Sequence, residues 1–187
     1  MKRTDIILRT ISFMTLSFLF GGCSSAPLAT RLVNESLLRE SQSITIKKFE
    51  SRNATLNYEG NVDSLGHVMA AYVQIALAEG NSRMKASVTP GDTVRTDLIM
   101  EGRFTNIDAG SGAARILVGT GGATVAIWGV IKSKSGDIIA EFSKSKTSSG
   151  GPLGMGGLLA GNGEKIIDDS MMEIARDIAQ FVSSGKK

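Results

Sequence analysis

The stretch ATVAIWGVIKSKSGDIIAEFSKSK, residues 123–146, decides the fold of this chain. Its first part, Ala123 to Ile131, is apolar at both odd and even positions, which is typical of a central strand with both faces covered. Residues 132–137 are polar and contain Gly136, so they predict a turn. From residue 138 on, the pattern predicts a second strand, with one face formed by Ile138, Ala140 and Phe142 and the other by Ile139, Glu141 and Ser143. The two strands are therefore expected to form an antiparallel hairpin.

Further strands are predicted on both sides of this hairpin. Apolar and polar residues alternate in Ser43–Glu50, where Ile44 and Ile46 share one face. Arg83–Thr89 is a shorter strand candidate, and Pro90-Gly91-Asp92 after it predicts a turn. Val94–Ile107 alternates over a long stretch, whereas the polar segment Ser51–Gly60 is expected to be a loop.

Two segments show the periodicity of amphipathic helices. In Asn61–Ala78, apolar residues recur every three or four positions, and Gly80-Asn81 predicts the end of the helix. In Glu164–Val182 the apolar stripe is more regular, and Asn162 is the expected N-cap. The predicted fold class is α+β: a single small, mixed and largely antiparallel sheet of about five strands, with two amphipathic helices packed on one face.

Composition excludes several classes of protein. The chain has 187 residues, of which 42% are hydrophobic and 21% charged, so it can bury a core and is not wholly disordered. Its net charge of +3 gives no indication of nucleic-acid binding. One cysteine and one histidine rule out an internal disulfide framework and leave almost no means of building a Cys/His zinc site. We therefore expect no metal and no cofactor.

The N-terminus has the layout of a lipoprotein signal peptide. Lys2, Arg3 and Arg9 form a basic start, and the apolar run from residue 11 to residue 20 is too short to span a bilayer. The sequence LFGGC at residues 19–23 resembles a bacterial lipobox, so we expect cleavage after residue 22 and acylation of Cys23. An ordinary signal peptide with a chance cysteine is the alternative.

These features predict a division of the chain into four parts. They are a signal peptide at residues 1–22, an acylated cysteine and tether at 23–42, one α+β domain at 43–182 and a frayed tail at 183–187. Ser24, directly after the cysteine, resembles the sorting pattern of outer-membrane lipoproteins in Gram-negative bacteria.

The glycine-rich segment Gly110–Gly122 is the most unusual local feature. A phosphate-binding loop is one interpretation, but Arg115 stands where a dinucleotide fingerprint needs glycine, and no G-K-[ST] follows. A structural loop is a second interpretation, and a partner-binding or membrane-facing patch is a third. The candidate partner surface consists of Gly110, Gly112, Arg115, Gly119 and Gly121. A second glycine-rich segment, Gly150–Gly161, is a further candidate.

Other residues that could carry chemistry have simpler explanations. His67 lies in a predicted helix without partners and is expected to be exposed and without a role. Asp168 and Asp169 are expected in the first turn of the last helix, where they favour the helix dipole. Trp128 lies in an apolar strand and is interpreted as a core residue rather than a ligand platform. No residue can be assigned as a catalytic nucleophile.

Three motifs carry a resemblance to a known family. These are Asp97–Arg103, the pattern G-S-G-x-x-R-x-x-x-G at residues 110–119, and the two strands around Ser135-Gly136-Asp137. With them the chain, over residues 43–182, resembles the domain of unknown function 4410, a family of small bacterial lipoproteins. The family has no established activity, so the resemblance implies no catalytic residue. Its order of elements is also similar to the anticodon-binding-like domains of TolB and of the curli-secretion lipoprotein.

The expected function follows from the anchor and from the lack of a catalytic constellation. We expect an outer-membrane-anchored lipoprotein that faces the periplasm and acts as a non-enzymatic interaction or envelope-assembly module. Its expected partners are the membrane, through the acyl chains, and an envelope protein, with homo-oligomers possible and no nucleic acid. An oligomeric secretion or pore-associated lipoprotein is the alternative, and an enzyme or small-ligand binder is a third possibility.

Overall fold

The structure is a computed structural model that describes residues 24–80, 84–88, 96–111, 122–148 and 163–184. In these residues eight strand segments form one mixed sheet, in the order β1-β8-β7-β6-β3-β5, with β2 also paired to β8 and β4 to β6. The strands are β1 (Ser24–Ser25), β2 (Ala29–Leu32), β3 (Ser43–Ile46), β4 (Thr55–Asn57), β5 (Lys85–Val88), β6 (Leu98–Asp108), β7 (Ala123–Ser133) and β8 (Ile138–Ser148). The helices are α2 (Glu35–Glu40), α3 (Val62–Glu79) and α6 (Gly163–Ser184).

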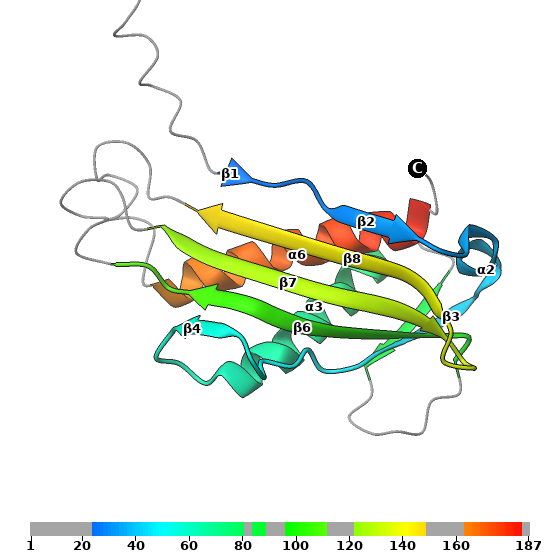
Figure 1. Cartoon of the computed structure of the whole chain (residues 1–187), viewed down its shortest axis with the longest axis horizontal. Coiled ribbons are helices and arrows are strands. Elements are labelled where there is room, and N and C mark those ends of the chain that lie inside the picture. The colour runs from blue at the N-terminus through cyan, green and yellow to red at the C-terminus, as the bar shows by residue number, and fades with distance from the viewer. Residues whose placement is uncertain (1–23, 81–83, 89–95, 112–121, 149–162, 185–187) are drawn as a thin grey trace, which may run out of the picture.

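The predicted α+β class is confirmed, and the hairpin lies at the centre of the sheet. β7 pairs with β8 and with β6 along almost its whole length, both times antiparallel. β3 is parallel to β6 and to β5, which makes the sheet mixed. Helices α3 and α6 lie side by side on one face of the sheet, and the other face is open (Figure 1).

Both long helices form where their periodicity predicts them. Asn61 caps α3, because its side-chain oxygen accepts the Ser64 N–H at 3.2 Å, and Gly80 follows the last turn. The apolar stripe of α6 is buried at Ile167, Met171 and Ile174. The N-cap expected at Asn162 and the turn expected at Pro90-Gly91-Asp92 lie outside the described residues.

The sheet is larger than predicted, because polar segments add edge strands to it. β4 forms within the expected loop Ser51–Gly60 and pairs with β6, from Thr55 opposite Asn106 to Asn57 opposite Asp108. The segment expected as a tether forms β1, β2 and α2, and both strands pair with β8. Leu38 of α2 is only 1% exposed. The described domain therefore begins well before Ser43, since backbone pairing and one buried leucine hold this segment on the sheet.

The two faces of β8 differ from the prediction at its start. The register shifts beside Ile131, so that Ile131 faces Ala140 while Lys132 faces Ile138. As a result Ile139 is buried together with Ala140 and Phe142, whereas Ile138 is 42% exposed. This irregularity, which sequence alternation cannot predict, turns Ile138 to the open face.

Farther along β8, polar pairs connect the sheet to α6. Lys144 forms an ion pair with Asp177 at 2.6 Å, and Lys146 forms one with Glu173. Both lysines are buried, with 7% and 8% exposed. The Ser148 and Ser170 hydroxyls continue the series at 3.3 Å. Each step of two residues along β8 thus corresponds to a step of about one turn back along α6. These pairs fix the position of the helix along the strand.

Candidate functional site on the open sheet face

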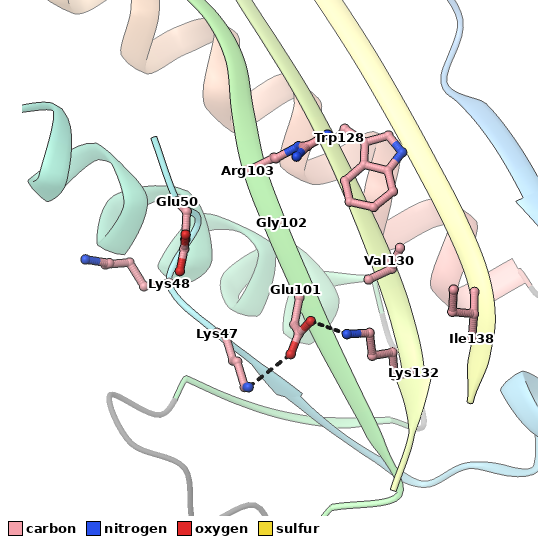
Figure 2. Close-up of a pocket in the computed structure, with 10 residues that line it drawn as sticks. All are labelled: Lys47, Lys48, Glu50, Glu101, Gly102, Arg103, Trp128, Val130, Lys132 and Ile138. Atoms are coloured by element: carbon pink, nitrogen blue, oxygen red, sulfur yellow. Dashed lines mark hydrogen bonds and ion pairs between the residues drawn. The ribbon is translucent and has the colours of Figure 1, made fainter. Parts of the chain in front are cut away.

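The open face carries a groove of about 480 Å³ that runs across β6 and β7, from the segment after β3 to the start of β8 (Figure 2). We call it the open-face groove. It is lined by Lys47, Lys48, Glu50, Glu101, Gly102, Arg103, Trp128, Val130, Lys132 and Ile138. Four of these residues are cationic and two are anionic, so the groove has an excess of positive charge.

Arg103 and Trp128 form the aromatic part of the groove. They face each other across β6 and β7, and the Arg103 guanidinium carbon lies 4.8 Å from the centre of the Trp128 ring. This is a cation–π contact. Trp128 is half-buried on the open face, so its interpretation as a core residue is wrong. On the next strand the residue opposite Trp128 is Ser143, whose side chain is small.

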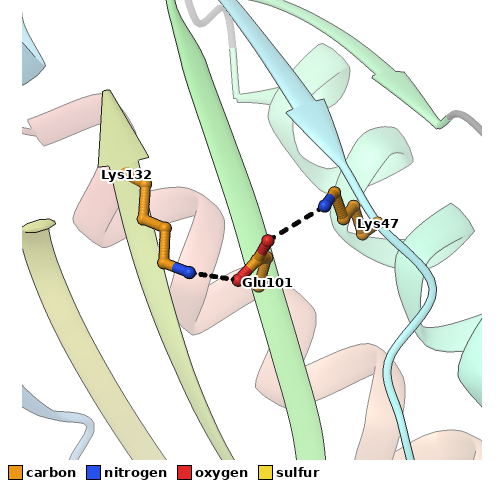
Figure 3. Close-up of polar contacts among 3 residues, drawn as sticks. All are labelled: Lys47, Glu101 and Lys132. Carbon is orange, nitrogen blue, oxygen red and sulfur yellow. Dashed lines mark hydrogen bonds and ion pairs between the residues drawn. The ribbon is translucent and has the colours of Figure 1, made fainter. Parts of the chain in front are cut away.

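Glu101 is the centre of the charged part of the groove. Its carboxylate accepts a hydrogen bond from the Lys47 ammonium at 3.0 Å and from the Lys132 ammonium at 2.5 Å (Figure 3). The bond from Lys132 lowers the pKa of Glu101 most, and the bond from Lys47 adds to it, while partial burial opposes both. Glu101 is therefore ionised at neutral pH and holds the two lysines on either side of β6.

The segment after β3 forms one wall of the groove, and backbone bonds attach it to β6. The Glu50 N–H donates to the Gly102 carbonyl at 2.9 Å, and the Phe104 N–H donates to the Glu50 carbonyl at 2.7 Å. Lys48 pairs with Asp63 of α3 at 2.7 Å, which lowers the pKa of Asp63. The wall is thus fixed from two sides.

Of the candidate partner surface, only Gly110 lies in the described residues. It has a φ of 67°, in the left-handed region that glycine tolerates, and its N–H donates to the Asp108 carboxylate at 2.8 Å. Gly112, Arg115, Gly119 and Gly121 lie outside the described residues, as do Cys23 and the second glycine-rich segment, Gly150–Gly161. The structure therefore leaves that surface a prediction.

The described residues that flank the two glycine-rich segments lie close to the start of β1. Ser24 pairs with Thr147 near the end of β8, and β6 ends at Asp108 opposite Thr124 of β7. The residue after Cys23 and the residues that flank both glycine-rich segments therefore lie at one end of the sheet (Figure 1). We call this the anchor end, after the acylation that the sequence predicts at Cys23.

The remaining predicted residues have ordinary surroundings. His67 is exposed, as predicted. Asp168 and Asp169 lie beyond the first turn of α6, because the helix begins at Gly163, so the expectation of a role at the helix dipole is wrong. Asp168 accepts a hydrogen bond from Tyr72 at 2.6 Å, and Asp169 accepts one from Lys165 at 2.8 Å.

Sequence reasoning missed the open-face groove. The alternation in Val94–Ile107 did place Glu101 and Arg103 on the polar face of their strand. The missing signal was the position of Trp128, because an apolar run does not reveal which of its residues face solvent.

Among the described residues, no group of three or more His, Cys, Asp or Glu side chains could hold a metal ion. The same part of the chain has no helix both long and apolar enough to cross a membrane.

Comparisons with known proteins give a family and a fold. The model of the family described as Domain of unknown function (DUF4410) matches residues 29–152. A search of curated proteins finds no similar sequence. The PelC dodecamer from Paraburkholderia phytofirmans has a similar structure, with a TM-score of 0.53 at 9% identity, covering 81% of this chain and 97% of PelC. A variant of the same PelC with one leucine replaced by methionine is also a dodecamer. Its TM-score is 0.54 at 7% identity, and the match covers 84% of this chain and 99% of the PelC variant. At these identities the likeness concerns the fold alone.

Proposed function

The chain belongs to the DUF4410 family, and from this starting point we propose that it is a non-enzymatic envelope lipoprotein that assembles into homo-oligomers at a membrane. Acyl chains on Cys23 attach it to the outer membrane, and the domain faces the periplasm. The observation that carries this proposal is the position of the lone cysteine directly before β1, after a signal-like segment.

The anchor end determines which side of the domain would face the membrane in this proposal. A chain acylated at Cys23 continues at once into β1, which pairs with β8, so little free chain separates the lipid from the sheet. Two or more acyl chains hold a protein on a bilayer stably, because each buried CH₂ contributes about 0.8 kcal/mol. The anchor end therefore faces the membrane, and both glycine-rich segments start from that side.

Homo-oligomer formation is proposed from the structural comparison. The two PelC structures are dodecamers, and this fold covers nearly all of the PelC chain. A sheet with β5 at one edge and β1 and β2 at the other has two different edges for neighbours in a ring. An assembly of this kind also fits the alternative function, an oligomeric secretion or pore-associated lipoprotein.

Acylation is tested by mass spectrometry of the N-terminal peptide from membranes of a Gram-negative host. We expect the wild-type peptide to begin at Cys23 with added acyl chains. The Cys23→Ser variant should lack the lipid and leave the membrane fraction, while the control Ser25→Ala should behave like the wild type. An unmodified wild-type peptide, or a Cys23→Ser variant that stays in the membrane, contradicts the proposed anchor.

Assembly is tested by size-exclusion chromatography with light scattering on detergent-extracted protein. A defined multimer of the acylated chain supports the proposal, and its stoichiometry distinguishes a ring from a dimer. A monomer at all concentrations contradicts the oligomer and excludes the pore-associated alternative.

A further inference from the structure

We propose that the open-face groove binds an acidic saccharide, with Trp128 as the stacking surface for a sugar ring and Arg103, Lys47 and Lys132 as donors to its carboxylates. This proposal rests on the proposed function in one respect: it names the ligand that an interaction module of this kind would bind. The groove is complete within one chain and does not involve the acylated cysteine.

The aromatic part of the groove suits a sugar ring. Trp128 is half-buried, so its ring is fixed by neighbours and still accessible from the open face. Arg103 is exposed and its guanidinium lies over one side of the ring, so the surface left for a sugar is on the other side, where the neighbouring residue is the small Ser143. A sugar ring has a C–H face that packs on an aromatic ring, while its polar edge reaches neighbouring donors.

The charged part of the groove suits carboxylates on that sugar. An ammonium carries three donors, and the bond to Glu101 uses one of them in each of Lys47 and Lys132. Two lysines around one carboxylate leave a net positive charge. The side chains of Lys47 and Lys132 are 36% and 31% exposed, so a ligand can reach both ammonium groups. The two lysines are on opposite sides of Glu101, which favours a ligand with repeated charges over a single small anion.

Backbone pairing argues for a saccharide over an extended peptide. β6 and β7 are paired on both sides, so their N–H and C=O groups are used within the sheet. A peptide strand that adds to a sheet needs a free edge, which the groove does not provide. Recognition must come from side chains, and these are an indole, a guanidinium and ammonium groups.

The test uses the acylated full-length protein in detergent and a saccharide of defined charge. Trp128 is the only tryptophan of the chain, so its fluorescence reports directly on the groove. We expect oligogalacturonate to change the emission saturably, and added salt to weaken the binding. An uncharged dextran oligosaccharide and poly-L-glutamate serve as the neutral and the non-sugar probes, and both should have much weaker effects.

Variants assign the response to residues, with calorimetry as the common measure of affinity. Arg103→Glu should weaken binding about tenfold or more, and Lys132→Gln by a smaller factor, because Lys47 still pairs with Glu101. Trp128→Ala should abolish binding, while Trp128→Phe should retain part of it. Arg176→Glu, a charge reversal on the helix face, is the matched control and should bind like the wild type. Circular dichroism establishes that each variant is folded.

Several outcomes would overturn the proposal. Equal binding of poly-L-glutamate means that the groove is a general polyanion or protein surface, and equal binding of dextran means that its charges have no role. Failure of all probes, with Trp128 shielded from a soluble quencher, means that the face is covered by another copy of the chain. Lipid attachment and oligomer size are measured separately from saccharide binding. A failure to bind saccharide therefore leaves the proposed function intact, and a failure of acylation or assembly leaves the saccharide proposal intact.

Discussion

Tyr72 connects the two long helices through a single short hydrogen bond. Its hydroxyl donates to the Asp168 carboxylate at 2.6 Å, and this bond, with partial burial, raises the pKa of Tyr72 to about 12 from its ordinary 10.0. Because the folded pKa is raised, the stabilisation is complete below pH 10 and is lost as the pH rises toward 12. Tyr72 therefore contributes to the alkaline limit of stability.

We predict that Tyr72→Phe lowers the free energy of unfolding by about 1 kcal/mol at neutral pH, because Asp168 loses its donor. The variant should also lose less stability than the wild type between about pH 10 and pH 12. Urea denaturation at several pH values measures both effects. Tyr58→Phe is the comparison variant: the pKa of Tyr58 is raised mainly by burial and without a hydrogen bond to Asp168, so its alkaline change should be smaller than that of Tyr72→Phe. Identical alkaline limits in Tyr72→Phe and the wild type would refute this role.

At the scale of elements, the ion pairs between β8 and α6 are unequal in burial. The Lys144 side chain is 6% exposed, whereas its partner Asp177 is 38% exposed. Removing the partner of a buried charge costs more than removing the buried charge itself, because the charge left behind cannot be solvated.

We therefore predict that Asp177→Ala destabilises the fold by about 2–3 kcal/mol, while Lys144→Met costs less than about 1 kcal/mol. The methionine keeps the apolar stem of the lysine, and Asp177 remains partly solvated. Chemical denaturation compares the two variants, with Lys165→Met as the control for an exposed lysine on α6. A larger loss in Lys144→Met than in Asp177→Ala would contradict the argument from burial.

Helix α2 offers a second prediction at this scale, because it decides whether the N-terminal segment belongs to the domain. Leu38 is 1% exposed and packs in the core, whereas Val33 nearby is 54% exposed. We predict that Leu38→Ala costs about 3 kcal/mol and Val33→Ala almost nothing. Thermal unfolding of both variants measures the difference. A negligible effect of Leu38→Ala would mean that residues 23–42 are a tether after all.

The elements that can be predicted from sequence are those determined by residues within the element itself. α3, α6 and the β7–β8 hairpin follow from periodicity and a turn, since each period matches one buried face. β2 and β4 escape prediction because they are short polar edge strands that are stabilised by distant strands. The open-face groove escapes for the same reason: Lys47 meets Glu101 only through the parallel pairing around β3 and β6, and the side on which Trp128 lies is ambiguous in an apolar run.

At the scale of the whole molecule, the proposed acyl anchor and the strand directions together predict an orientation on the membrane. β7 and β8 each have eleven residues, which corresponds to roughly 35 Å at about 3.3 Å per residue. The turn around Ser135 is at the opposite end of the hairpin from β1, whereas Glu59 is near the anchor end.

This predicted orientation can be measured because Cys23 is the only cysteine, and the proposed acylation blocks its thiol. A cysteine introduced at Glu59 or Ser135 is then the only reactive thiol for a fluorophore. We predict that lipid-borne quenchers in vesicles reduce the emission at Glu59→Cys far more than at Ser135→Cys. Equal quenching at the two sites would mean that the sheet lies flat on the bilayer.

The pairing of β1 and β2 with β8 also has a mechanical consequence. If Cys23 carries the proposed lipid, tension between the lipid and the domain acts on the chain at Ser24, along the direction of strands that run away from the anchor end. Such a load shears the ladder, so that the pairs from Ala29 to Leu32 bear it together instead of opening one after another. Beyond them, the buried Leu38 resists withdrawal of the segment. In the proposed lipoprotein, the pairing of the N-terminal strands with β8 would transmit force from the membrane into the sheet.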